Sequence, residues 1–146
     1  LFGSGFRRLV EASAHYDLGD YLAAAKARAE FAHKVHMLFE DVDLLLLPTV
    51  PIEPFAAERE APEGWTSGSD VLAWTGWTPF TYPFNLSGNP AASLPCGLTA
   101  GGLPVGLQVV GRRHADAQVM AFCQHAENIV SIDRLPPLVV AGDRVE

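Results

Sequence analysis

Apolar residues in the first third of the chain recur at the spacing of a helix. Between Tyr21 and Asp41 no Gly or Pro interrupts, and one apolar stripe runs through Ala24, Ala27, Phe31, Val35 and Leu38. Such a stripe predicts an amphipathic α-helix, and we expect Asp20 to cap its N-terminus. A shorter helix is predicted from Phe6 to Tyr16.

Three short apolar runs have the length of strands. They cover residues 44–47, 91–94 and 105–110, and each is closed by Pro or Gly. None alternates cleanly between apolar and polar residues, so we expect both faces of the sheet to be covered. A link of hairpin length joins the second run to the third, and its Gly101 and Gly102 can adopt the positive φ that tight turns often need.

The remaining segments complete the order of elements. Residues 51–70 hold three Pro, two Gly and the cluster Glu58-Arg-Glu60, and we interpret them as a variable loop. Residues 115–129 are predicted to form a closing helix, and residues 131–146 a C-terminal tail. The alternation of helices and strands predicts an α/β fold, in which a mixed β-sheet is covered by α-helices.

Composition excludes several classes of protein. Of 146 residues, 49% are hydrophobic and 18% charged, as in a well-buried globular chain. The net charge of −7 argues against a nucleic-acid partner. No apolar run approaches the roughly 20 residues of a membrane span, no signal peptide is visible, and no cofactor is predicted. Cys96 and Cys123 lack CxxC spacing, which favours a cytoplasmic location.

Two pairs of polar residues have a spacing that could carry chemistry. His33 and His36 lie three residues apart on the long predicted helix, but no nearby acid or cysteine completes a ligand set, so no metal site is predicted. Asp41 and Asp43 flank the first strand and are expected to face solvent at the end of a helix and the start of a strand. General acid–base catalysis would need both to converge on a pocket.

No catalytic residue is predicted in this chain. A nucleophilic serine needs an adjacent base, and the only lysines, Lys26 and Lys34, both lie in the alanine-rich helix. Ser87 and Ser93 are therefore not assigned as nucleophiles. Cys96 has no histidine near it in sequence and is expected to be a small buried thiol.

Large rings gather before the second strand. Five aromatic residues lie within eleven positions, and Pro79 and Pro83 disfavour one regular helix through this segment. The rings could simply pack in the core. Around a pocket, they would favour an apolar or aryl substrate over a small polar one.

Two separated motifs resemble the amidase signature family. Its C-terminal signature is similar to NLSG at 85–88, Pro90, AASLPCG at 91–97 and GLPVGLQ at 102–108. Upstream, DVDLLLLPT at 41–49 is similar to the strand that this family places before a long variable loop. Both motifs occur in the family's order, and with the flanking helices the resemblance covers roughly residues 15 to 130.

The resemblance implies a serine hydrolase that cleaves the C–N bonds of small-molecule amides, not of peptides. The family's enzymes are longer, so residues 1–146 look like the C-terminal portion of a single amidase domain. The Ser-Ser-Lys catalytic set would lie outside this chain, and the fragment alone would be inactive. Its partner would be the N-terminal catalytic portion of the same enzyme. Trp74, Thr75, Thr78 and Tyr82 would share one helix face bordering the substrate.

Two alternatives remain open at this stage. The chain also resembles, less closely, the A subunit of the tRNA-dependent glutamyl-tRNA(Gln) amidotransferase, which would act with partner subunits on mischarged tRNA. It could instead be a non-catalytic structural module that needs a partner. The sequence leaves the amide substrate undetermined, and it leaves open a homodimer in which a second chain covers an exposed apolar face.

Overall fold

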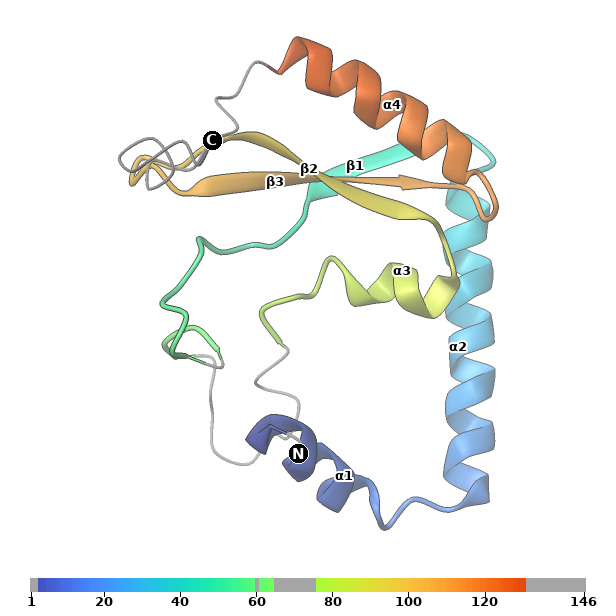
Figure 1. Ribbon diagram of the computed structural model, residues 1–146. Helices are drawn as coiled ribbons and strands as arrows, with labels where there is room; N and C mark the ends of the chain where they lie inside the picture. The colour runs from blue at the N-terminus through green and yellow to red at the C-terminus, as the bar shows by residue number, and fades with distance from the viewer. Residues whose placement is uncertain (1–2, 60, 65–75, 131–146) are drawn as a thin grey trace, which may run out of the picture.

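The computed structural model describes residues 3–59, 61–64 and 76–130. Its elements lie in the predicted order (Figure 1): α1 (Ser4–Ser13), α2 (Leu18–Leu38), β1 (Leu44–Pro48), α3 (Tyr82–Ser87), β2 (Ala91–Leu98), β3 (Pro104–Gly111) and α4 (Asp116–Ile129). The α/β fold is confirmed. The predicted tail falls outside the described residues, as does part of the predicted loop. Among the described residues no helix is both long and apolar enough to cross a membrane.

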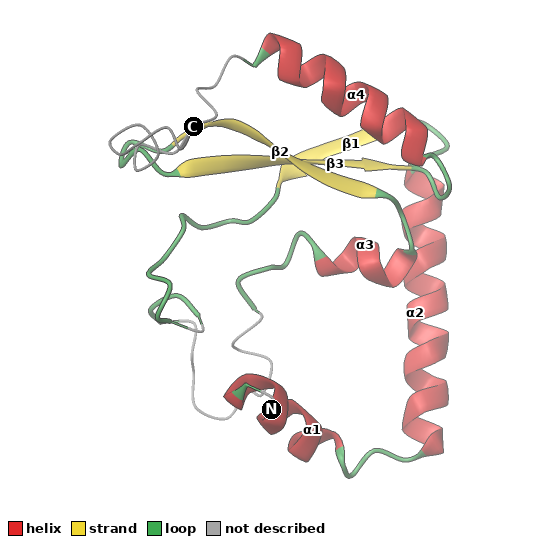
Figure 2. Ribbon diagram, viewed as in Figure 1, coloured by secondary structure: helices red, strands yellow, loops and turns green. Residues whose placement is uncertain are grey.

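The described strands form one sheet in the order β1-β3-β2, with both outer strands antiparallel to β3. Helix α4 lies over one face, and α2 and α3 lie on the other (Figure 2). Central strand β3 is therefore covered on both sides, as its continuous apolar run predicts. Because β3 lies between β1 and β2, it holds both outer strands in place.

Adjacent residues of β3 point into two different cores. Val110 packs with the helices α2 and α3 in one cluster, and Val109 packs with α4 in the other. Both valines are 0% exposed. Alternation along a strand sends neighbours to opposite faces, and burying each valine contributes about 1.5–3 kcal/mol. The central strand thus holds both helical layers.

Only the C-terminal part of α2 is packed against the sheet. Phe31, Val35 and Phe39 are spaced four apart, so they lie on one face of the helix, and they join the cluster beneath Val110. The first half of α2 is exposed along its length and touches α3 instead. There Arg28 Nε donates to Leu86 O at 2.8 Å, which fixes the end of α3 to α2.

The cap of α2 differs from the prediction. The N-cap is Asp17, not Asp20, and the helix begins at Leu18. The two carboxylates form a capping box, in which Asp17 Oδ1 accepts from the N–H of Asp20 and Asp20 Oδ2 accepts from the N–H of Asp17, both at 3.0 Å. Two aspartates three residues apart satisfy two free helix N–H groups at once, which the single-cap expectation left out.

The second strand extends beyond its apolar run. It continues through Pro95 to Leu98, with a register shift between Pro95 and Gly97. Proline has no N–H for a ladder, and it is tolerated here because β2 is the outer strand of the described sheet and is irregular at that point. The turn that follows is closed by Thr99 N donating to Leu103 O at 2.8 Å. Of its two glycines, Gly102 has a positive φ, 78°.

Candidate functional site

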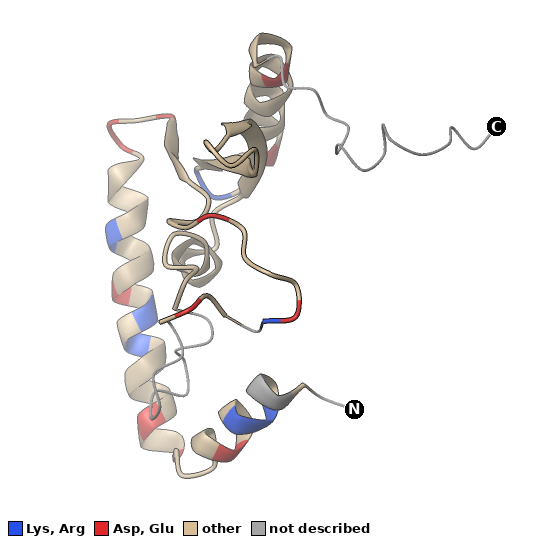
Figure 3. Ribbon diagram, turned by 90° about the vertical axis from the view of Figure 1, so that its left-hand side faces the viewer, with Lys and Arg blue, Asp and Glu red and all other residues tan. Residues whose placement is uncertain are grey.

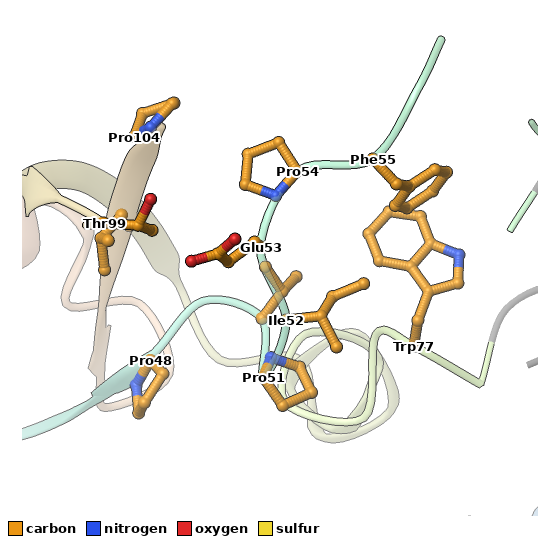
Figure 4. Close-up of a pocket in the computed structure, with 12 residues that line it drawn as sticks. Pro48, Pro51, Ile52, Glu53, Pro54, Phe55, Trp77, Thr99 and Pro104 are labelled. Carbon is orange, nitrogen blue, oxygen red and sulfur yellow. The ribbon is translucent and has the colours of Figure 1, made fainter. Parts of the chain in front are cut away.

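A cavity of about 580 Å³ lies at the end of the sheet where β1 finishes and β3 begins (Figure 4). The segment that follows β1 forms one wall, and the β2–β3 turn forms another. Trp77, from the segment before α3, lies beside the first wall. The cavity is lined by Pro48, Val50, Pro51, Ile52, Glu53, Pro54, Phe55, Trp77, Thr99, Pro104, Val105 and Gly106. Apolar side chains with few polar groups are typical of small-molecule sites.

Prolines explain why the chain leaves the sheet at this wall. Thr49 still pairs with the central strand, donating its N–H to Gly106 O at 2.9 Å. Pro51 and Pro54 have no N–H to continue such a ladder. The segment therefore separates from β3, and the space between the two becomes the cavity.

The apolar end of the cavity is formed by two rings. Phe55 and Trp77 pack edge to face, with centroids 5.2 Å apart and planes at 87°. This geometry is a favourable arrangement of aromatic quadrupoles, worth about 0.5–1.5 kcal/mol beyond area burial. The pair joins the segment after β1 to the segment before α3, so it holds two walls of the cavity together.

The polar end lies at the β2–β3 turn. In Figure 4 the Glu53 carboxylate points toward Thr99 and Pro104, away from the two rings. Thr99 is held by the turn itself, because its hydroxyl oxygen accepts from the N–H groups of Gly101 at 3.2 Å and Leu103 at 3.3 Å. The cavity therefore has a carboxylate at one end and aromatic rings at the other.

A hydroxyl bridge crosses the central strand beside the cavity. The Thr49 and Ser93 hydroxyls, one after β1 and one on β2, lie 2.6 Å apart. A Cβ on residue 106 would come within 2.7 Å of Thr49 Oγ1 and 2.9 Å of Ser93 Oγ. Gly106 is thus the residue that lets the two outer strands meet above β3.

A buried amide positions the segment that carries Trp77. Gln108 on β3 is buried, and its Nε2 donates to Phe80 O at 2.7 Å. A buried amide must find a hydrogen-bond partner, and the lone polar residue of this apolar strand finds one in the Phe80 carbonyl. The bond ties the approach to α3 to the centre of the sheet.

The predicted substrate residues are placed only in part. Trp74 and Thr75 lie outside the described residues. Thr78 is half-buried in a turn before α3, and Tyr82 is the first residue of α3, so these two do not share one helix. The six-residue α3 begins next to Pro83, which suits a first helical turn but not a helix interior. Neither Thr78 nor Tyr82 lines the cavity; their neighbour Trp77 does. In the sequence, the high density of aromatic residues in this segment was the feature that pointed to Trp77.

Both serines of the signature have structural partners. The Ser87 hydroxyl donates to Asn89 Oδ1 at 2.7 Å, and Asn89 Nδ2 donates to Gly111 O at 2.7 Å, which fixes the turn between α3 and β2 to the end of β3. Ser93 is bonded to Thr49. In the described part of the chain, no three His, Cys, Asp or Glu side chains are grouped to hold a metal ion.

Comparisons with known proteins agree with this architecture. The amidase family model matches residues 6–120. The chain is 37% identical over 129 residues to the A subunit of the glutamyl-tRNA(Gln) amidotransferase of Granulibacter bethesdensis, covering 88% of this chain and 24% of that protein. It is 33% identical over 124 residues to the fatty acid amide hydrolase of Medicago truncatula, covering 84% and 20%. The chain therefore spans about a fifth to a quarter of the length of these curated relatives.

Solved structures show the same fold. A 6-aminohexanoate cyclic dimer hydrolase superposes with a TM-score of 0.73 and 27% identity, over 92% of this chain and 29% of that one. A bacterial aryl acylamidase superposes with a TM-score of 0.69 and 31% identity, over 87% and 26%. The family model covers most of the chain, and the three strands carry much of both motifs. The chain therefore belongs to the amidase family, the amidase signature enzymes.

Proposed function

We propose that this chain is the C-terminal portion of an enzyme that hydrolyses the C–N bond of a carboxamide to a carboxylate and ammonia or an amine. The observation that carries the proposal is the likeness of the whole described sheet and its helices to two amide-cleaving enzymes of known structure. The apolar cavity at the end of that sheet supports a role in holding a small-molecule substrate.

The catalytic set belongs, in this proposal, to the part of the enzyme outside this chain. There a serine attacks the carbonyl carbon, a second serine relays the proton, and a lysine is the base. Backbone N–H groups hold the oxyanion, the electrostatic contribution that is usually largest. This chain contributes a wall of the substrate pocket, to which we assign Trp74, Thr75, Thr78 and Tyr82 together with the cavity. Alone it is inactive, because its two described signature serines lack a base.

The N-terminal catalytic portion is the proposed partner. Outer strand β1 leaves Leu46 52% exposed, and the residues of the first half of α2 are all exposed although that half contacts α3. Apolar surface of this kind needs a cover, which the rest of the domain would supply; a second copy of the chain is the other candidate. We also propose a cytoplasmic location, since Cys96 and Cys123 are both free thiols.

An assay of the source protein tests the proposal. Its intact mass and N-terminal sequence are determined, and hydrolysis of an aryl amide is followed by amine release. We expect a polypeptide several times the 15.7 kDa of this chain that releases amine. A 15.7 kDa product without hydrolysis would contradict the enzymatic proposal and favour a structural module.

An amidotransferase component is a second candidate, favoured by the 37% identity to one such protein. Its activity would need partner subunits and a mischarged tRNA. Hydrolysis of an aryl amide by the isolated enzyme supports the general amidase. Transfer of ammonia from glutamine that appears only with partner subunits supports the amidotransferase.

A further inference from the structure

One charged side chain lines the cavity, and it is a carboxylate. Among the lining residues only Glu53 carries a charge; the others are apolar residues, Gly106 and Thr99. The Glu53 carboxylate has no ion pair or hydrogen bond to another described residue, whereas Arg59 on the same loop pairs with Glu63 at 3.3 Å. Its negative charge is therefore available to a ligand.

The backbone around Glu53 is held in a restricted conformation by two prolines. Pro54 follows it directly, and the residue before a proline is confined to extended conformations. Pro51, two residues earlier, has a fixed φ. In Figure 4 the carboxylate lies on the Thr99 side of the cavity and points toward Thr99. Glu53 is itself exposed, so its carboxylate is accessible to a ligand that enters from solvent.

The loop as a whole carries a negative field. Its described part, residues 50–64 without residue 60, holds Glu53, Glu58 and Glu63 against Arg59, and these acidic residues are spread along the loop in Figure 3. Of these, Glu53 is the one that lines the cavity, and a charge on the wall of a cavity raises the local concentration of the opposite charge. The chain's net charge of −7 acts in the same direction.

The other end of the cavity suits the body of the same ligand. Phe55 and Trp77 offer ring surface to an alkyl or aryl group, and ring faces also attract cations. The prolines around them add apolar area without N–H donors that could bind an anion.

From these features we infer that the cavity binds an organic ammonium ion on an apolar or aryl stem, with Glu53 as the residue that selects for positive charge. The ammonium lies between Glu53 and Thr99, and the stem lies against Phe55 and Trp77. The substrate class rests on the proposed amidase function: substrates that fit this site are carboxamides that carry a cationic amine on an apolar stem. The binding site itself does not depend on that function.

Equilibrium binding to the intact protein tests the site without requiring turnover. The probes are 2-phenylethylammonium and neutral 2-phenylethanol, compared by titration calorimetry at low salt. We expect the cation to bind about 1.4- to fivefold more tightly, the range for one exposed ion pair. Glu53→Gln should equalise the two dissociation constants, and the matched control Glu58→Gln, on the same loop but outside the lining, should keep the preference. Phe55→Ala should weaken both probes.

Equal affinities in the unmodified protein, or loss of the preference in both glutamine variants, would overturn the inference. So would a preference that survives Glu53→Gln. The proposed function is read separately, from amide hydrolysis. A protein that prefers the cation but releases no amine contradicts the amidase proposal and supports the cation site. A protein that hydrolyses amides but binds both probes equally supports the amidase proposal and contradicts the cation site.

Discussion

The hydroxyl oxygens of Thr49 and Ser93 lie 2.6 Å apart above Gly106, although 44 residues separate them in the chain. They come from the two outer elements of the sheet and meet over its central strand. Gly106 also lines the cavity, so the bridge fixes the cavity wall to both sides of the sheet.

Gly106→Ala should separate the two hydroxyls. Its Cβ would lie within 2.7 Å of Thr49 Oγ1 and 2.9 Å of Ser93 Oγ, and overpacking of this kind costs about 1–3 kcal/mol. Urea unfolding of the purified protein measures the loss. Gly97→Ala is the control, because nothing lies within 4 Å of a Cβ at that position. Equal stability of the two variants would show that the bridge does not constrain the sheet.

Gln108→Leu should release the segment that carries Trp77. The change keeps the volume approximately but removes the donor to Phe80 O, which is only partly buried, and a typical hydrogen bond contributes about 0.5–1.5 kcal/mol. We expect lower stability together with reduced quenching or a shifted emission of tryptophan fluorescence. The control Gln124→Leu alters an exposed position on α4 and should change neither. An unchanged unfolding midpoint for Gln108→Leu would contradict the positioning role.

Asp17→Ala should shorten or loosen α2 at its start. The variant loses the N-cap acceptor of the capping box, and such losses cost about 0.5–2 kcal/mol. Amide hydrogen exchange should accelerate in the first turn of α2 and stay unchanged near Phe39, which is held by the sheet. Asp17→Asn, which retains an acceptor oxygen, should behave close to the unmodified protein. Fast exchange in both variants would show that the negative charge of Asp17, and not its capping hydrogen bond, stabilises the first turn of α2.

The Cys123 thiol should react slowly with alkylating agents below alkaline pH. Burial raises its pKa above the ordinary value, and the negative charge of Glu127 raises it further. Because only the thiolate is nucleophilic, alkylation at pH 8 should be slower than that of a small free thiol. Glu127→Gln should lower the pKa and speed the reaction, whereas Glu127→Asp should change it less.

The same shift has a defined sign for stability. A thiol whose pKa is raised by folding favours the folded state below its unfolded pKa, and this contribution is lost as the pH rises through the folded pKa. Unfolding experiments across the alkaline range should therefore show stability falling with pH, and less so in Cys123→Ala. A stability that rises in this range would contradict the assignment.

Most elements of the fold could be predicted from local pattern. The stripe through Phe31 and Val35 indicated α2, and this is confirmed. The continuous run at 105–110 indicated a strand covered on both faces, which holds from Gln108 to Val110, whereas Val105 is 37% exposed. The cap of α2 was predicted wrongly, since Asp17 and Asp20 are both good caps and the sequence alone did not reveal their reciprocal bonds. The family, too, was recognisable from two motifs and is confirmed by the family model.

The site depended on contacts that no local pattern contains. Phe55 meets Trp77 across 22 residues, and Gln108 reaches Phe80 across 28. Such contacts depend on the register between β1, β3 and β2, which brings together segments far apart in the chain. The sequence by itself determined the helices, the strands and the family, because spacing and motif are local properties. Only the tertiary structure decided that Glu53, Trp77 and Thr99 line one cavity, because strand pairing, not sequence distance, places them together.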